Sequence, residues 1–252
     1  MSTALVTGPT AGIGLAFARR LAKDGYDLVL VARNEARLSQ VAAELAQAYG
    51  TTSEVLVADL GDRDQLAAVE KRVAEGVDVL VNNAGYGLNQ PFWANDVAEE
   101  QQLLDVLVTA PMRLSHAAVR EMRVRRGGTV INVASVAAFT PRGTYSAAKA
   151  YLVNLSEWLN QFCASDGVRV MALCPGFVRT EFHQRGAMDM SHLPFFAWLD
   201  ATRVVEDAMT DLERGRAVSV PSLRYKTVVA ASRLVPRRVV GKIASIGRAG
   251  PN

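Results

Sequence analysis

Residues 7–14 read TGPTAGIG and place three glycines, Gly8, Gly12 and Gly14, between an apolar run and a helical pattern. The run ALVTG that leads into this stretch favours a β-strand, and the pattern from Leu15 to Lys23 predicts a helix. Glycines let a backbone turn tightly and approach a pyrophosphate, and the exposed amides of a helix N-terminus stabilise the negative charge. Because the stretch stands between a strand and a helix, it predicts a dinucleotide-binding turn.

Six more short apolar runs follow along the chain, separated by segments of helical periodicity. They read DLVLVAR, EVLVADL, VDVLVNNAG, GTVINVAS, VRVMALCPG and AVSVP. Strands that alternate with helices are typical of a parallel sheet covered on both faces, and right-handed crossovers favour a doubly wound arrangement. We therefore predict an α/β fold of the Rossmann type, with about seven parallel strands and helices on both faces. A single NAD(P)-binding domain would span residues 1–252.

The composition is that of a globular protein, with 50% hydrophobic and 21% charged residues. The two cysteines, Cys163 and Cys174, have no close spacing that would hold a metal, which favours a reducing compartment and two small buried side chains. The three histidines show no metal-like grouping, so we expect no metal. The first strand-like run begins at Ala4, which leaves no room for a signal peptide, and no apolar run approaches ~20 residues. We expect a soluble, cytoplasmic protein.

Two segments depart from the alternation of strands and helices. Residues 182–200, between the sixth and seventh strands, are interpreted as an insertion that covers the substrate, because such sheets bind ligands beyond the carboxyl ends of their strands. Residues 222–252 are interpreted as a basic, helical C-terminal extension. No acid follows Glu213, and eight basic residues stand from position 216 onward: Arg216, Arg224, Lys226, Arg233, Arg237, Arg238, Lys242 and Arg248.

A basic extension of this kind has two interpretations. It can make peripheral contact with an anionic surface such as a membrane. Alternatively, it can be a helix with a solvated basic face that docks on the rest of the protein through residues such as Val228, Val229 and Leu234. We favour docking on the body, and we expect no nucleic-acid partner.

Several motifs occur in a fixed order along the chain. The glycine pattern G-x-x-x-G-x-G is followed by NNAG at residues 82–85, by Ser135, by YSAAK at residues 145–149 and by PGFVRT at residues 175–180. This set resembles the short-chain dehydrogenase/reductase (SDR) family over nearly the whole chain, from Ala4 to about Val220. The resemblance implies a nicotinamide cofactor, with Asp59 at the adenine and Thr180 at the carboxamide. It implies these further contacts: Gly8, Thr10, Gly12, Ile13, Gly14, Asn82, Ala84, Gly85, Tyr145, Lys149, Pro175, Gly176 and Val178.

The end of the second strand bears on the choice between NAD(H) and NADP(H). An acid there would accept hydrogen bonds from a free ribose hydroxyl and repel a 2'-phosphate, but this sequence reads VARN, with Arg33 in that place. A guanidinium matches phosphate oxygens, so we predict NADP(H), with Arg37 one turn further along as a second contact. Ala11 stands where NADP(H)-preferring relatives often carry another basic residue. The alternative for Arg33 is an ordinary solubilising residue.

Tyr145 and Lys149 are four residues apart in the alanine-rich segment TYSAAKAYL and therefore share one face of a helix. At ~5 Å and a dielectric constant of ~20, an ammonium attracts a phenolate by about 3 kcal/mol, which lowers the phenol pKa by roughly two. The resemblance implies that Tyr145 gives its proton to the substrate carbonyl as hydride arrives, that Lys149 holds the ribose and that Ser135 hydrogen-bonds the carbonyl oxygen. The alternative for Ser135 is a cap on the local backbone.

One family position departs from the pattern. The asparagine that keeps a water near the lysine in the family aligns with Leu107, and a leucine cannot hold a water by hydrogen bonds. An apolar group there would also lower the pKa of the Lys149 amine by desolvation. The departure motivates an alternative function, a nucleotide-binding regulatory or scaffold protein with attenuated catalysis.

The leading hypothesis is an NADPH-dependent oxidoreductase that reduces an apolar ketone or aldehyde. Many aromatic and thioether side chains occur in the segments expected at the pocket: Tyr86, Phe92, Trp93, Phe139, Phe182, Met188, Met190, Phe195, Phe196 and Trp198. Simple packing is the other explanation for them. The resemblance also implies a homodimer or homotetramer, formed through the helices that contain Leu107 and Tyr145.

Overall fold

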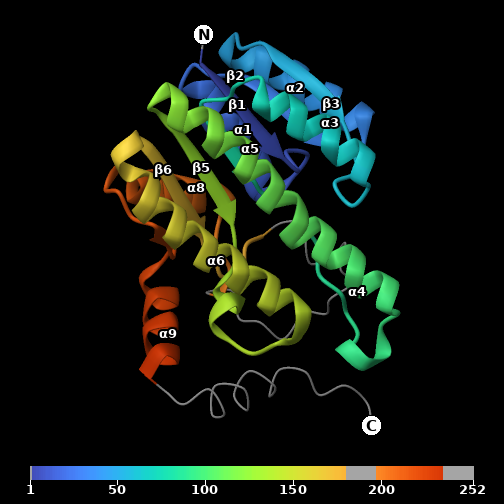
Figure 1. Ribbon diagram of the computed structural model, residues 1–252, viewed down its shortest axis with the longest axis vertical. Coiled ribbons are helices and arrows are strands. Elements are labelled where there is room, and N and C mark those ends of the chain that lie inside the picture. The colour runs from blue at the N-terminus through green and yellow to red at the C-terminus, as the bar shows by residue number, and fades with distance from the viewer. Residues whose placement is uncertain (1, 180–196, 235–252) are drawn as a thin grey trace.

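The computed structural model describes residues 2–179 and 197–234. Its centre is one sheet with the strand order β3-β2-β1-β4-β5-β6-β7, and every neighbouring pair is parallel (Figure 1). The strands are β1 Thr3–Thr7, β2 Asp27–Ala32, β3 Ser53–Val57, β4 Val79–Asn82, β5 Gly128–Val133, β6 Val168–Leu173 and β7 Val218–Ser219. The predicted α/β fold of the Rossmann type, with seven parallel strands, is confirmed.

Helices connect the strands and cover both faces of the sheet. They are α1 Gly12–Lys23, α2 Glu35–Tyr49, α3 Arg63–Ala74, α4 Val97–Leu104, α5 Ala110–Arg125, α6 Gly143–Cys163, α8 Ala201–Glu213 and α9 Leu223–Leu234. Shorter helical segments are η1 Phe92–Ala94, η3 Val136–Phe139 and η4 Ala164–Asp166, and a π-helical segment, η2 Asp105–Thr109, joins α4 to α5.

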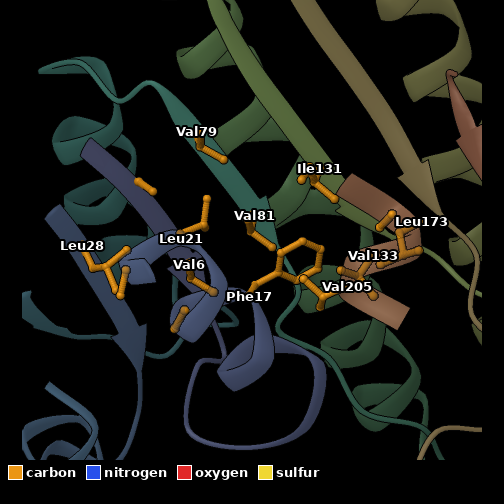
Figure 2. Close-up of a cluster of buried hydrophobic side chains, with 14 of the residues drawn as sticks. Val6, Phe17, Leu21, Leu28, Val79, Val81, Ile131, Val133, Leu173 and Val205 are labelled. Atoms are coloured by element: carbon orange, nitrogen blue, oxygen red, sulfur yellow. The ribbon is translucent and has the colours of Figure 1, made fainter. Parts of the chain in front are cut away.

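The core lies in two layers because neighbouring strand residues point to opposite faces. Helices α1, α2 and α8 pack on one face, and Figure 2 shows Phe17 of α1 among Val81, Val133 and Val205. Helices α3, α5 and α6 pack on the other face. Both cysteines are buried and neither forms a disulfide, as expected from the composition. Sequence runs such as DLVLVA are apolar at successive positions since both faces of a parallel sheet are covered.

The functional edge of the sheet lies where the strands end. Strand β1 has β2 on one side and β4 on the other, so the crossovers leave it in opposite directions and open a crevice beyond its carboxyl end. The turns after β1, β4, β5 and β6 meet at this edge because the strands are parallel. These turns carry the glycine motif, NNAG, Ser135 and PGFVRT respectively.

The two unusual segments are described only in part. Of the expected insertion, residues 182–196 lie outside the described residues, as do Thr180 and residues 235–252 of the expected extension. Helix α9 buries Val229 against the body, whereas Val228 is exposed. Within residues 2–179 and 197–234, no helix is long and apolar enough to cross a membrane.

Candidate active site

The glycine turn after β1 has the shape that its sequence predicts. Gly8 and Gly12 have φ angles of 66° and 56°, a left-handed conformation that favours glycine. A Cβ on Gly14 would lie 2.1 Å from the Gly8 carbonyl oxygen, so no other residue fits there without moving the backbone. The turn is therefore closed tightly against the first residues of α1.

The N-terminus of α1 is open to an anionic ligand. Its first turn contains no acidic residue, and its N-cap residue, Ala11, has no side chain that could accept a hydrogen bond from its amides. Helices α2, α3, α4 and α8 are instead capped by Asn34, Asp62, Asp96 and Asp200. Uncapped amides beside a glycine turn fit the pyrophosphate of a dinucleotide.

Residues of the NNAG motif hold this turn in place. Asn83 donates from Nδ2 to the carbonyl oxygens of Thr7 and Gly8, at 2.9 and 3.0 Å. The backbone amides of Asn83 and Ala84 donate to the Thr7 hydroxyl at 2.9 and 3.0 Å. Thr7 and Asn83 are therefore positioning residues that the motifs had not identified. A hydroxyl at the end of β1 and a second amide side chain in NNAG were the available signals.

Charged side chains form an exposed rim beside the glycine turn. Arg33 follows β2, its side chain is 74% exposed, and Nη1 lies 3.8 Å from Oδ2 of Asp59. The other Asp59 oxygen accepts a hydrogen bond from the Gly61 amide at 2.9 Å. Arg37 donates from Nε to the carbonyl oxygen of Thr10 at 3.3 Å. The expected cofactor residues Arg33 and Asp59 thus lie next to each other, and Arg37 reaches the glycine turn itself.

Helix α6 brings Tyr145 and Lys149 together. The Lys149 Nζ lies 5.7 Å from the centre of the Tyr145 ring, and it donates to the Val133 carbonyl oxygen at 2.7 Å. Only 5% of Lys149 is exposed. Burial penalises the charged amine and lowers the Lys149 pKa to about 8.

The pKa of Tyr145 differs from the expectation. Burial raises the Tyr145 pKa to about 12, and a hydrogen bond from the Ser135 hydroxyl opposes this rise only in part. The net pKa of Tyr145 is therefore raised rather than lowered, because burial of the phenol is the largest effect on it, and the Lys149 amine is directed to Val133.

Ser135 has both of the roles that the sequence left open. Its Oγ accepts a hydrogen bond from the Ala137 amide at 3.1 Å and so caps the short helix η3. The same hydroxyl is the hydrogen-bond partner that acts on the pKa of Tyr145. The cap therefore orients the hydroxyl toward the phenol.

Leu107 lies beside Lys149 in the π-helical segment η2, and only 1% of it is exposed. A Cβ on Gly85 would lie 2.7 Å from Leu107 Cδ2 and 3.9 Å from Lys149 Nζ, so Gly85 separates the two side chains closely. This agrees with the expectation that an apolar group at position 107 helps to desolvate the amine.

A cavity of about 10 Å³, roughly the room of one water, lies next to these side chains. Leu107, Lys149 and Asn82 all line it. Asn82 donates from Nδ2 to the Ser115 hydroxyl and to Asn132 Oδ1, at 3.0 and 2.8 Å. Its own Oδ1 is buried and accepts no hydrogen bond from the residues that the structure describes. A polar atom thus remains available near Lys149 although the family asparagine is absent.

The remaining predicted residues are distributed along the same edge. Pro175, Gly176 and Val178 form the turn after β6, which is tied to the Ser135 loop by a hydrogen bond from the Val136 amide to the Pro175 oxygen, at 3.0 Å. Phe139 is partly buried in a cluster with α9. Phe92 and Trp93 lie in η1 and are largely exposed, so they line no enclosed pocket among the described residues. No group of three metal-ligating side chains occurs in the parts of the chain that are described.

Comparison with known proteins agrees with this geometry. The family model described as short chain dehydrogenase matches residues 2–190. Dehydrogenase/reductase SDR family member 4 of Oryctolagus cuniculus is 40% identical over 189 residues, which are 71% of this chain and 71% of that protein.

Two solved structures resemble the whole fold. A short-chain dehydrogenase from Sphingobium yanoikuyae in complex with NADPH has a TM-score of 0.85 and 33% identity, over 92% of this chain and 94% of its own. The bulky-bulky ketone specific alcohol dehydrogenase from Comamonas testosteroni has a TM-score of 0.81 and 31% identity, over 92% of both chains. The chain belongs to the short-chain dehydrogenase/reductase family and is an oxidoreductase of that family.

Proposed function

We propose that this chain is an NADPH-dependent reductase that converts an apolar ketone or aldehyde to an alcohol. The observation that carries the proposal is the group formed by Ser135, Tyr145 and Lys149, at the same edge of the sheet as the glycine turn. A bound nicotinamide supplies the hydride in this chemistry. The protein's own side chains supply the proton and hold the carbonyl oxygen.

Tyr145 is the general acid in this proposal. With a pKa of about 12 the phenol stays protonated at neutral pH, so it has a proton to donate. A phenol with so high a pKa is a weak acid, and it gives up its proton only as negative charge develops on the carbonyl oxygen. The Ser135 hydroxyl, next to the phenol, donates a hydrogen bond to that same oxygen and stabilises the charge.

Lys149 places a positive charge near the Tyr145 phenol. Its pKa of about 8 leaves the amine mostly protonated at pH 7. One of the three N–H groups of an ammonium donates to Val133, so the others are the donors that would hold the ribose hydroxyls of the cofactor. The positive charge also stabilises the phenolate that remains on Tyr145 after proton transfer.

NADP(H) rather than NAD(H) is proposed because two arginines flank the glycine turn. Arg33 is exposed at the end of β2, and Arg37 contacts the backbone of Thr10, so their guanidinium groups can approach a 2'-phosphate from two sides. No carboxylate takes the place of Arg33 directly after β2. One similar solved structure is a complex with NADPH.

An apolar substrate is proposed because the side chains near Tyr145 are apolar. Tyr86, Leu88 and Leu104 pack in one cluster with Tyr145 and Leu107. A solved relative is described as specific for bulky-bulky ketones.

A homodimer or homotetramer in the cytoplasm completes the proposal. Trp158 and Phe162 of α6 are more than half exposed, and their ring centres lie 5.1 Å apart. Such an apolar pair on an outer helix face supports contact with a second copy.

NADPH oxidation with a panel of apolar ketones and aldehydes tests this function. We expect turnover by the parent chain, and a loss of about 100-fold or more in Tyr145→Phe with NADPH still bound, because the general acid is removed. Tyr151→Phe, on the same helix, is the matched control and should keep its activity.

The same experiment separates the second candidate function. Leu107, buried beside Lys149, favours a nucleotide-binding regulatory protein with attenuated catalysis. Tight NADPH binding without turnover of any compound in the panel would support that alternative and contradict the reductase.

A further inference from the structure

Tyr225 of α9 lies against the turn that follows β6. A Cβ placed on Gly176 would come within 2.0 to 2.4 Å of three atoms of the Tyr225 ring. This is far closer than any real contact, so the ring occupies the space that a side chain at position 176 would need. Gly176 is therefore required by the tyrosine packed on it, since its own φ is not in the left-handed region.

The Tyr225 hydroxyl is hydrogen-bonded on both of its sides. It accepts from the backbone amide of Phe177 at 3.2 Å and donates to the carbonyl oxygen of Ala197 at 2.7 Å. One side chain thus satisfies two backbone groups that are 20 residues apart in sequence. The phenol is partly buried, and burial raises the Tyr225 pKa, which keeps the hydroxyl able to donate at neutral pH.

The surroundings of Tyr225 connect the same turn to the catalytic loop. Tyr225 packs in an apolar cluster with Val136 and Phe139, which belong to the segment that starts at Ser135. Figure 1 shows α9 beside the loop that precedes α6. A short parallel bridge joins Val178 to Leu199, and the Leu199 amide donates to the Phe177 oxygen at 2.7 Å. The turn is therefore held from behind by α9 and from the side by residues 197–199.

We propose that Tyr225 is a positioning residue that fixes the turn from Gly176 to Val178 for the nicotinamide half of the cofactor. The inference rests on the proposed function, since it takes the ligand of this turn to be a nicotinamide dinucleotide. It extends that function to α9, a helix outside the motifs that identify the family. The role is structural support for binding, because the hydroxyl and the ring are both used against the backbone.

Two ligands and two tyrosine variants test the inference. NADPH contains the nicotinamide half, whereas adenosine 2',5'-bisphosphate contains only the adenine half, and the dissociation constants of both are measured by calorimetry. Tyr225→Phe removes both hydrogen bonds but keeps the ring, so we expect NADPH to bind about tenfold more weakly and the bisphosphate within about twofold of the parent. Tyr49→Phe, at the end of α2, is the matched control and should change neither constant.

The outcomes distinguish the two proposals. Unchanged NADPH binding in Tyr225→Phe, or an equal weakening of both ligands, would overturn the positioning role and leave the proposed function intact. A parent chain that binds neither ligand would overturn both.

A second pair of variants tests the contact between the ring and Gly176. Gly176→Ala should weaken NADPH binding in the parent, because the new methyl group displaces the ring. In a Tyr225→Ala background the same change should have little further effect, since the ring is gone. If the two substitutions act additively, Gly176 touches the cofactor without help from Tyr225, and the proposal is wrong.

Discussion

The two ends of the proposed cofactor site place a cation in opposite surroundings. The Arg33 side chain at the adenine side is 74% exposed, and its Nη1 lies 3.8 Å from Asp59 Oδ2 in a solvent-exposed ion pair. Lys149 at the catalytic centre is 5% exposed, beside a leucine and a partly buried phenol. Water and salt screen the first charge, whereas burial makes the second costly enough to bring its pKa to about 8.

This difference shows what each end can contribute. An exposed arginine adds to affinity at little cost to folding, but its contribution is modest and depends on salt. A buried lysine reduces stability in exchange for a cation held in a low-dielectric site, where it acts strongly on a developing charge.

Two serine hydroxyls, one partly buried and one buried, allow the centre to be tested with the same chemical change. Ser135→Ala removes the hydroxyl that partners Tyr145 and should lower kcat by about 100-fold or more, because one donor to the developing oxyanion is lost. Ser146→Ala removes a buried hydroxyl that has no hydrogen-bond partner among the described residues, so it should leave kcat unchanged. Steady-state kinetics with saturating NADPH measures both. Equal losses in the two variants would show that altered packing, rather than the loss of the Ser135 hydroxyl, lowers kcat.

Lys149→Met should stabilise the fold while it removes activity. The fall of the Lys149 pKa from 10.5 to about 8 corresponds to about 3 kcal/mol of folding free energy at neutral pH. The variant also loses the hydrogen bond to Val133, which lowers its stability by about 1 kcal/mol. We therefore expect the variant to be about 2 kcal/mol more stable than the parent at pH 7. Urea unfolding measures this difference.

The pH dependence gives the sign of the Lys149 effect. Below pH 8 both the folded and the unfolded chain carry the proton, so the full cost of burial is present. Between about pH 8 and 10.5 the unfolded chain keeps a proton that the folded chain has released, and the stability of the parent rises with pH. The advantage of Lys149→Met should therefore shrink above pH 8 and be absent at pH 10.5. Lys71→Met, at an exposed lysine, should show no such trend.

The rim should respond differently. Arg33→Ala should weaken NADPH about tenfold and leave NADH unchanged, because charge-assisted hydrogen bonds to a 2'-phosphate are lost. The difference should shrink as the salt concentration rises from about 0.05 to 0.5 M, since the charge is exposed. Arg203, 72% exposed on α8, is a matched control, and Arg203→Ala should change neither affinity. A preference for NADPH that survives Arg33→Ala would assign the phosphate contact to Arg37.

The sequence predicted those parts of the molecule that depend on local pattern. The glycine turn could be predicted because the need for Gly8, Gly12 and Gly14 comes from the backbone geometry of the turn itself, within a few residues. The pKa of Tyr145 could not be, since it depends on how completely the folded chain removes water from the phenol, which spacing on a helix does not reveal.

Long-range contacts account for the other misses. Asn83 supports the glycine turn across 75 positions of sequence, and Tyr225 reaches Phe177 across 48. The residue types hint at such roles, but neither pairing can be read from local pattern, because the partners are far apart in sequence and meet only in the folded chain. Leu107 shows the intermediate case. Its position was found by alignment with a motif, but its closeness to Gly85 and Lys149 required the structure.

The smallest effect on activity is expected from restoring the family asparagine. Leu107→Asn places an amide beside the Lys149 amine, which returns part of its solvation and should raise the Lys149 pKa. Reduction needs that amine protonated, so the fall in kcat/KM as the pH rises past about 8 should move upward, by less than one pH unit. Leu103 is an equally buried leucine one turn earlier. Leu103→Asn should therefore destabilise the fold by a similar amount without changing the pH at which kcat/KM falls. A shift in both variants would trace the change to loosened packing, and a shift in neither would mean that burial by the rest of the site, rather than Leu107, sets the pKa of Lys149.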